Sequence, residues 1–215
     1  MPAPVPPLAT ADLDHVLART SPLWTGARGA RFFITGGTGF FGTWLLESLV
    51  HANEVLKLDL QAVVLTRNPA AFASRMPHLA NRRDLRFLQG DLETFRFPDG
   101  KFSHLIHAAA ETGVWTHQQP ATGLCERITR GMGHLLEFAE GAGVSRFLHV
   151  GAGAMYGPVP TGVTHVPDNH PCQRAPLPAD ADGFGLGLCR GREVDPKRQR
   201  VRQLVDGYAH SVKPV

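Results

Sequence analysis

Eight residues, "TGGTGFFG" from Thr35 to Gly42, restrict the fold of this chain more than any other stretch. They begin at the last residue of the apolar run 31–35, and they precede a segment whose apolar residues recur at helical spacing. Within them Gly36, Gly39 and Gly42 stand three residues apart. Glycine allows tight turns and close backbone contacts that a Cβ atom would prevent. The stretch therefore predicts a sharp connection between a buried strand and a helix.

The same alternation of strand and helix continues along the chain. Further apolar runs lie at 62–66, 85–88, 103–110 and 147–150. Two sets of residues mark helical faces: Phe41, Leu45, Leu46, Leu49 and Val50 in the first, and Ile128, Met132, Leu135, Leu136 and Ala139 in the second. Continuous apolar strands separated by amphipathic helices are typical of a parallel sheet covered on both faces. We therefore predict an α/β fold with a doubly wound parallel sheet of the Rossmann type.

Composition and charge divide the chain into three parts. Apolar residues make up 43% of the 215 and charged residues 19%, which is typical of a globular protein. No apolar run reaches the ~18 residues of a membrane-spanning helix. The net charge of +3 comes from the segment 188–215, which has seven Lys or Arg against three Asp or Glu. We predict an N-terminal extension (1–29) with a short helix from Ala11 to Thr20 capped by Thr10, a dinucleotide-binding domain (30–187) and a basic tail (188–215).

The glycine turn has the context that dinucleotide binding requires, since it opens the first helix after the first strand. The first glycine permits the turn, the second lets a pyrophosphate approach the backbone, and the third lets helix and strand pack closely. Amides at the helix N-terminus would then face the anion. No Gly-Lys-Ser/Thr follows, which disfavours a P-loop. The predicted cofactor-binding residues here are Thr35, Gly36, Gly37, Thr38, Gly39, Phe40, Phe41 and Gly42.

The end of the second strand indicates which dinucleotide is preferred. An acidic residue there binds the ribose 2′-hydroxyl of NAD, whereas an arginine accommodates the 2′-phosphate of NADP. The sequence "LTRNP" places Arg67 at this point and contains no carboxylate. Arg67 therefore favours NADP, with NAD as the alternative. Arg67 could also be an ordinary surface arginine at a turn, with no role in cofactor binding.

Four segments together resemble the extended short-chain dehydrogenase/reductases, specifically the nucleotide-sugar epimerases and dehydratases. They are "TGGTGFFG", "GDL" at Gly90–Leu92, "HAAA" at His107–Ala110 and "RFLHVGAGAMYG" at Arg146–Gly157, and the resemblance spans 30–187. It implies that Asp91 and Leu92 flank the adenine and that Ala108, Ala109 and Ala110 line the cofactor cleft. It also implies a nucleotide-sugar substrate. A plain turn at "GDL" and a small-residue strand end at "HAAA" remain the alternatives.

The chemistry of the resembling family depends on three side chains that this chain lacks. A Tyr four residues before a Lys and a Ser or Thr hydroxyl move the proton as hydride passes to or from the nicotinamide. Neither Tyr156 nor Tyr208 is followed by such a Lys. The resemblance places Ala152 at the hydroxyl, Phe184 at the tyrosine and Leu188 at the lysine. The sequence therefore favours a dinucleotide-binding protein without redox turnover over an active epimerase, dehydratase or reductase that uses other residues.

Three alternatives stay open for the tail: a truncated or frame-shifted end, a genuine short variant, or a basic segment for an acidic partner. Nucleic acid is disfavoured, because the basic run has no interleaved aromatics. His165, His170 and Cys172 lack a fourth ligand, so no metal site is predicted. The three cysteines are widely spaced, which favours reduced thiols in a cytoplasm. For the oligomeric state, a homodimer is possible by analogy with the resembling family. Neither a signal segment nor a membrane partner is predicted.

Overall fold

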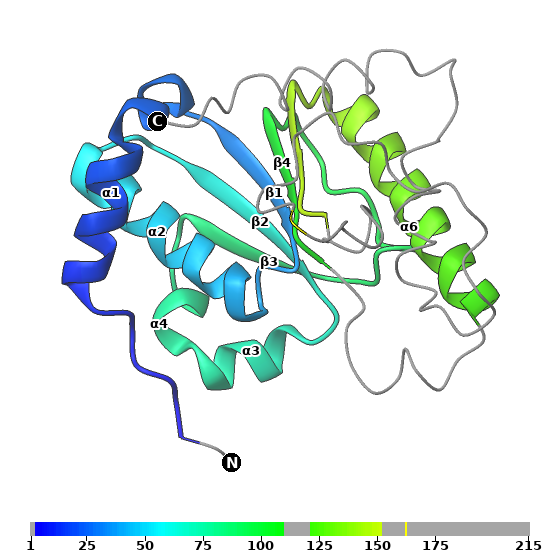
Figure 1. Cartoon of the computed structure of the whole chain (residues 1–215), viewed down its shortest axis with the longest axis horizontal. Helices are drawn as coiled ribbons and strands as arrows, with labels where there is room; N and C mark the ends of the chain where they lie inside the picture. Colours follow the sequence, from blue (N-terminus) through cyan, green and yellow to red (C-terminus); the bar gives the residue numbers. More distant parts are fainter. Residues whose placement is uncertain (1–2, 110–120, 152–161, 163–215) are drawn as a thin grey trace.

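The computed structural model describes residues 3–109, 121–151 and 162, and its elements form one parallel sheet with helices (Figure 1). In chain order they are α1 (Thr10–Trp24), the 3-10 turn η1 (Thr25–Ala27), β1 (Arg31–Thr35), α2 (Phe40–Leu56), β2 (Gln61–Thr66), α3 (Pro69–Arg75), α4 (Pro77–Ala80), β3 (Leu85–Gln89), β4 (His104–His107), α6 (Ala121–Ala142) and β5 (Arg146–His149).

The sheet has the strand order β3-β2-β1-β4-β5, and every neighbouring pair is parallel. The order reverses between β1 and β4, which are adjacent although β2 and β3 separate them along the chain. At such a switch point the connections leave β1 and β4 toward opposite faces, so a crevice opens at the carboxyl ends of the strands. The predicted doubly wound α/β fold is confirmed, and it places the glycine turn at that crevice.

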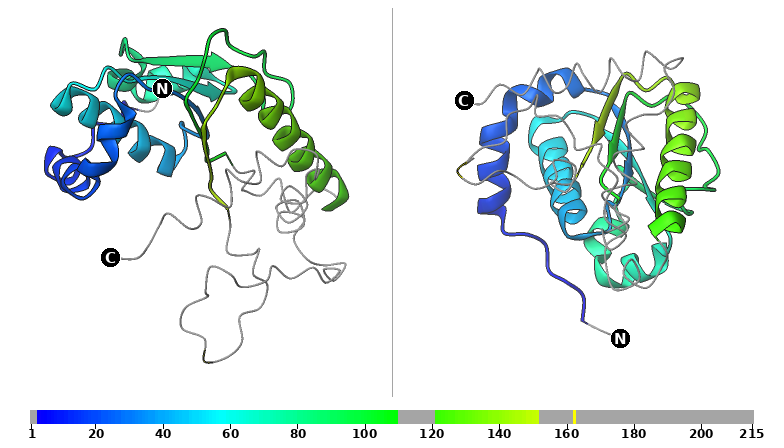
Figure 2. Two further views of the ribbon diagram at one scale, coloured as in Figure 1. Left: turned by 90° about the horizontal axis from the view of Figure 1, so that it is seen from above. Right: turned by 45° about the vertical axis from the view of Figure 1, so that its right-hand side comes forward.

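Two apolar clusters hold the helices to the sheet, one on each face. Within β1, the side chains of Phe32 and Ile34 belong to the cluster under α2, α3 and α4, whereas Phe33 belongs to the cluster under α6. Figure 2 shows α6 on one side of the strands and α1 and α2 on the other. This alternation follows from the period of two along a strand. The sheet is therefore buried on both faces, as the continuous apolar strands predicted.

Aromatic side chains fill the space beside α6 where no helix connects β3 to β4. The rings of Phe95 and Phe138 lie 5.3 and 4.5 Å from the ring of Phe33, and Phe102 lies 5.8 Å from it. All four side chains are buried. The segment between β3 and β4 thus covers its part of the sheet with rings, which fixes the ends of both strands without a helix.

The N-terminal extension packs on the sheet domain, and its helix is longer than predicted. The expected N-cap, Thr10, is wrong: Thr10 is the first helical residue, and Ala9 precedes it without a side-chain cap. At the other end, Trp24 Nε1 donates to Thr20 Oγ1 at 2.9 Å, which ties down the last turn beyond Thr20. Ahead of the helix, the backbone N–H of Val5 donates to the carbonyl of Arg75 at 2.8 Å.

The predicted strands agree with the structure to within one residue at their ends, except that β4 is the short core of the run 103–110. One face residue of α2 was misassigned. Phe41 has helical spacing with Leu45 and Leu49 but is 77% exposed, because it lies in the first turn of α2. In α6, Met132, Leu135, Leu136 and Ala139 are buried as predicted. Among the described helices, none combines the length and the apolar character needed to cross a bilayer.

Candidate functional site

The glycine turn between β1 and α2 is packed so tightly that a Cβ atom on Gly36, Gly37 or Gly42 would force a neighbouring group to move. Gly36 has φ +74°, and a Cβ there would overlap the backbone of Ala108 after β4. A Cβ on Gly42 would overlap the Gly36 carbonyl and the backbone of Gly37. Gly39 differs, since its nearest neighbour would be the Gly36 oxygen at 3.4 Å and the residue is exposed. The turn is closed on its inner side and open at Gly39.

The N-terminus of α2 has backbone amides that no helix carbonyl accepts. Thr43 is the first residue of α2 whose N–H is bonded within the helix, to the Gly39 oxygen at 2.9 Å. The amides of Phe40, Phe41 and Gly42 precede it, and Gly39 offers no side-chain cap. The adjacent helix α3 contrasts with this, since Asn68 Oδ1 caps the Ala71 amide at 2.9 Å. The first turn of α2 can therefore bind an anion at its amides.

Two phenylalanine side chains beside these amides are exposed to solvent. Phe40 is 75% exposed and Phe41 is 77% exposed, and their rings meet edge to face at 5.4 Å. Both residues were predicted for the site through their backbone. Their side chains are the largest exposed apolar groups next to the glycine turn.

Arg67 lies directly after β2, with its side chain exposed, at the same edge of the sheet as the glycine turn. Because β1 and β2 are parallel neighbours, with Thr35 paired to Leu65, their carboxyl ends lie side by side. No carboxylate occurs between Arg67 and Arg75. The position predicted for the adenosine ribose is thus occupied by a cation.

The "GDL" segment after β3 forms a turn. The Asp91 carbonyl accepts from the amides of Thr94 and Phe95 at 3.2 and 2.8 Å, and Asp91 Oδ1 accepts from the Glu93 amide at 3.0 Å. Leu92 is half-buried and packs on Gly131 of α6. A Cβ atom added to Gly131 would lie 3.0 Å from Cδ2 of Leu92. Asp91 is exposed. That these residues flank an adenine stays a prediction.

Thr35, at the end of β1, joins the ends of two strands. Its Oγ1 lies 2.6 Å from His107 Nδ1 and 3.4 Å from the Ala109 amide, and its carbonyl accepts from the Ala108 amide at 3.1 Å. Ala108 and Ala109 therefore follow β4 in a position fixed against the glycine turn. Both are half-buried, and Ala110 lies outside the described residues.

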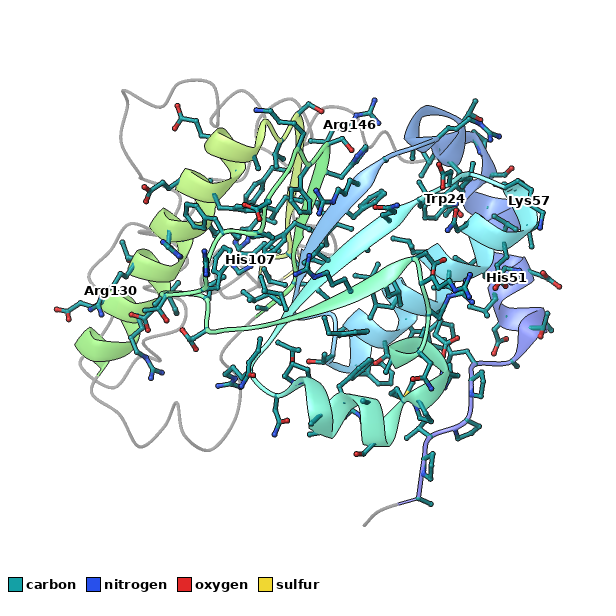
Figure 3. All side chains as sticks on the ribbon, turned by 180° about the vertical axis from the view of Figure 1, so that it is seen from behind. Trp24, His51, Lys57, His107, Arg130 and Arg146 are labelled. Carbon is teal, nitrogen blue, oxygen red and sulfur yellow. The ribbon has the colours of Figure 1, made fainter. Side chains whose placement is uncertain are left out.

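His107 is buried at this junction, and Figure 3 shows it deep in the molecule, away from the peripheral His51 and Lys57. It is 5% exposed, and its ring stacks on that of His149 at 5.1 Å and 17°. Burial lowers the pKa of His107 to about 3, with a smaller contribution from His149. The ring is therefore neutral at physiological pH and acts as a fixed hydrogen-bonding group.

Comparison with known proteins identifies the family to which this chain belongs. Residues 32–184 match the model of the NAD dependent epimerase/dehydratase family. The chain belongs to that family. The resemblance inferred from the motifs is thereby confirmed, and the matched region begins at β1 and contains the glycine turn, Arg67, Asp91 and the His107 junction.

Several members of the epimerase/dehydratase family resemble the chain individually. A dTDP-glucose 4,6-dehydratase of Streptomyces niveus is 27% identical over 136 residues, which cover 61% of this chain and 40% of that protein. The UDP-Glc/GlcNAc 4-epimerase of Campylobacter jejuni superposes with a TM-score of 0.60 at 23% identity, covering 83% of this chain and 50% of that one.

A third relative is DesIV, a dTDP-glucose 4,6-dehydratase from Streptomyces venezuelae whose structure contains NAD. It superposes with a TM-score of 0.60 at 23% identity, covering 81% of this chain and 53% of that one. The chain thus spans 40% of the curated relative and about half of each of these two structures. At this identity the structural likeness establishes the shared fold.

The structure also brings Arg75 to the site, which the sequence did not indicate. Arg75 ends α3, and its Nη2 donates to the carbonyl of Thr38 in the glycine turn. The two residues are 37 positions apart in sequence. No motif marks this contact, because it depends on how α3 packs beside α2. The hydrogen bond between Thr35 and His107 was missed for the same reason.

The positions predicted for the catalytic groups lie outside the described residues. They are Ala152, Phe184 and Leu188, together with Tyr156. The basic tail 188–215 and the candidate ligands His165, His170 and Cys172 lie outside them as well. Within the described part of the chain, no three His, Cys, Asp or Glu side chains come together as a metal site would require.

Proposed function

We propose that this chain is a nicotinamide-dinucleotide-binding member of the epimerase/dehydratase family that does not itself turn over substrate. The observation that supports binding is the glycine turn. It is closed against Ala108 and Gly42, open at Gly39, and followed by uncapped amides of α2. A pyrophosphate at these amides would meet both the backbone donors and the positive end of the helix dipole. DesIV, with the same fold, contains NAD.

NADP is the preferred cofactor in this proposal, with NAD as the alternative. Arg67 stands where an acidic residue would bind the 2′-hydroxyl of NAD, and its guanidinium suits a phosphate monoester. The ligands proposed for the remaining space are nucleotide-sugars, the class that several relatives act on. We place the protein in the cytoplasm because its cysteines are few and widely spaced.

The absence of turnover is proposed from the sequence. When bound, the nicotinamide accepts and returns a hydride, and a nearby acid or base must move the accompanying proton. No Tyr is followed by Lys four residues later, and Ala152, Phe184 and Leu188 occupy the expected positions. Within the described part of this chain, Thr35 would brace Ala109 and His107 would remain neutral. Neither one replaces a Tyr–Lys pair.

A turnover assay tests this proposal. The purified chain is incubated with NADPH or NADH and with UDP-glucose or dTDP-glucose, while sugar products and nicotinamide absorbance are followed. We expect saturable cofactor binding without a 4-epimer, a dehydrated sugar or a change in absorbance. Formation of either product at a rate that scales with protein concentration would instead establish the alternative, an active enzyme with non-standard catalytic residues.

A further inference from the structure

A second arginine lies at the corner where the end of β2 meets the glycine turn. Arg67 follows β2, α3 begins two residues later, and Arg75 ends α3 with its side chain directed back to the turn, where it donates to Thr38. The seven-residue helix α3 separates the two arginines. Arg67 is near the carboxyl end of β1 through the β1–β2 pairing. Arg75 is near it through Thr38.

This corner carries two arginine side chains. Both arginine side chains are exposed, and neither forms a salt bridge with any carboxylate among residues 3–109 and 121–151. The segments 35–42 and 67–75 contain no Asp or Glu. By contrast, Arg82, which precedes β3, is paired with Asp84 at 2.7 Å and with Glu54 at 2.6 Å. Arg67 and Arg75, which form no such ion pair within the described residues, lie instead beside the turn proposed to hold a dinucleotide.

The guanidinium of Arg75 is held in position yet retains donors. Its Cζ lies 5.7 Å from the centre of the Phe72 ring, and its backbone carbonyl accepts from the Val5 amide at 2.8 Å. A guanidinium has five N–H donors, and the Thr38 carbonyl takes one of them. The remaining donors can form a bidentate pair with a phosphate, at little cost in side-chain entropy because the group is already placed.

We propose that Arg75 binds the 2′-phosphate of NADP together with Arg67, and so determines the choice between NADP and NAD. The inference rests on the proposed function, because it requires the adenosine ribose to lie between the end of β2 and the glycine turn. A 2′-phosphate monoester carries close to two negative charges, which two guanidinium groups balance. NAD has no charge there, so Arg75 contributes to the affinity for NADP and little to that for NAD.

The experiment compares Arg75→Gln with the unmodified chain by calorimetric titration with NADPH, NADH and 2′,5′-ADP. Arg75→Gln should raise the Kd for NADPH and for 2′,5′-ADP roughly tenfold to a hundredfold, the effect of losing one charge-assisted hydrogen bond. The Kd for NADH should change less than about twofold, since no phosphate contact is lost. Arg75→Lys should retain part of the preference, because it keeps the charge without the planar fork.

Arg83→Gln is the matched control, since Arg83 is an exposed arginine in the turn before β3 and should leave all three affinities unchanged. Equal weakening of NADPH and NADH by Arg75→Gln would overturn the inference, because it would mean that Arg75 only braces the turn through Thr38. Unchanged affinities would overturn it too. If the unmodified chain binds neither dinucleotide, the proposed function fails with it, and the first titration alone reveals that case.

Discussion

Replacing Gly42 by alanine is expected to abolish dinucleotide binding and to lower the free energy of unfolding. The new Cβ would overlap the Gly36 carbonyl and the backbone of Gly37, neither of which can rotate away as a side chain would. The start of α2 would have to move off the turn, and the amides of Phe40 and Phe41 would move with it. Overpacking of this kind costs about 1–3 kcal/mol or more. Calorimetric titration and denaturant unfolding measure the two effects.

Gly133→Ala is the matched control for this change. Gly133 also lies inside a helix, α6, but a Cβ there would have no atom within 4 Å. Alanine should leave binding unchanged and raise stability by about 0.4–1 kcal/mol, the ordinary gain of glycine to alanine in a compatible helix. Wild-type affinity in Gly42→Ala would show that the packed turn does not position the ligand.

The second large effect is expected in the pH dependence of stability. The pKa of His107 is lowered from 6.5 to about 3 in the folded chain, mainly by burial. In the unfolded chain the imidazole of His107 therefore binds a proton below about pH 6.5, whereas in the folded chain it binds that proton only near pH 3. The stabilisation is complete above pH 6.5 and is lost as the pH falls through this window, at up to about 1.4 kcal/mol per pH unit. Burial also lowers the pKa of His104, which adds to the effect in the same direction.

This effect is tested by denaturant unfolding at several pH values between about 4 and 7. This range lies above the pKa of about 3 that His107 has in the folded chain. His107→Asn keeps a polar side chain beside Thr35 but does not titrate, so its stability should fall less steeply with decreasing pH than that of the unmodified chain. His15→Asn, at an exposed histidine of α1, is the control and should keep the original slope. A slope in His107→Asn equal to that of the unmodified chain would assign the pH dependence to other groups.

Local patterns in the sequence predicted the fold because the central strands β1 and β2 are buried on both faces. The run 31–35 has three consecutive apolar residues at its centre, and the structure forms β1 over the same five residues. The glycine turn was predictable for a related reason, since Gly36 and Gly42 are required by close backbone contacts within the turn and with Ala108. Where one segment determines its own conformation, the pattern was sufficient.

Contacts between distant segments could not be predicted in this way. Phe41 has the helical spacing of a core residue, yet its side chain is exposed, whereas the next residue, Gly42, is buried. Arg75 reaches Thr38, and Thr35 reaches His107, only through the packing of α3 and the β1–β4 register. These contacts depend on the tertiary structure, and the spacing of residue types along the sequence does not reveal them. Sequence motifs therefore predicted where the glycine turn and Arg67 lie in the fold, but they did not indicate the contacts made by Thr35 and Arg75.

The most direct test of the account is a calorimetric titration of the unmodified chain with NADPH and, separately, with NADH. We expect saturable binding of one dinucleotide per chain, with a lower Kd for NADPH than for NADH because of the cations beside the glycine turn. Absence of binding to both, in a preparation that unfolds cooperatively, would contradict it and would mean that the turn serves the fold alone.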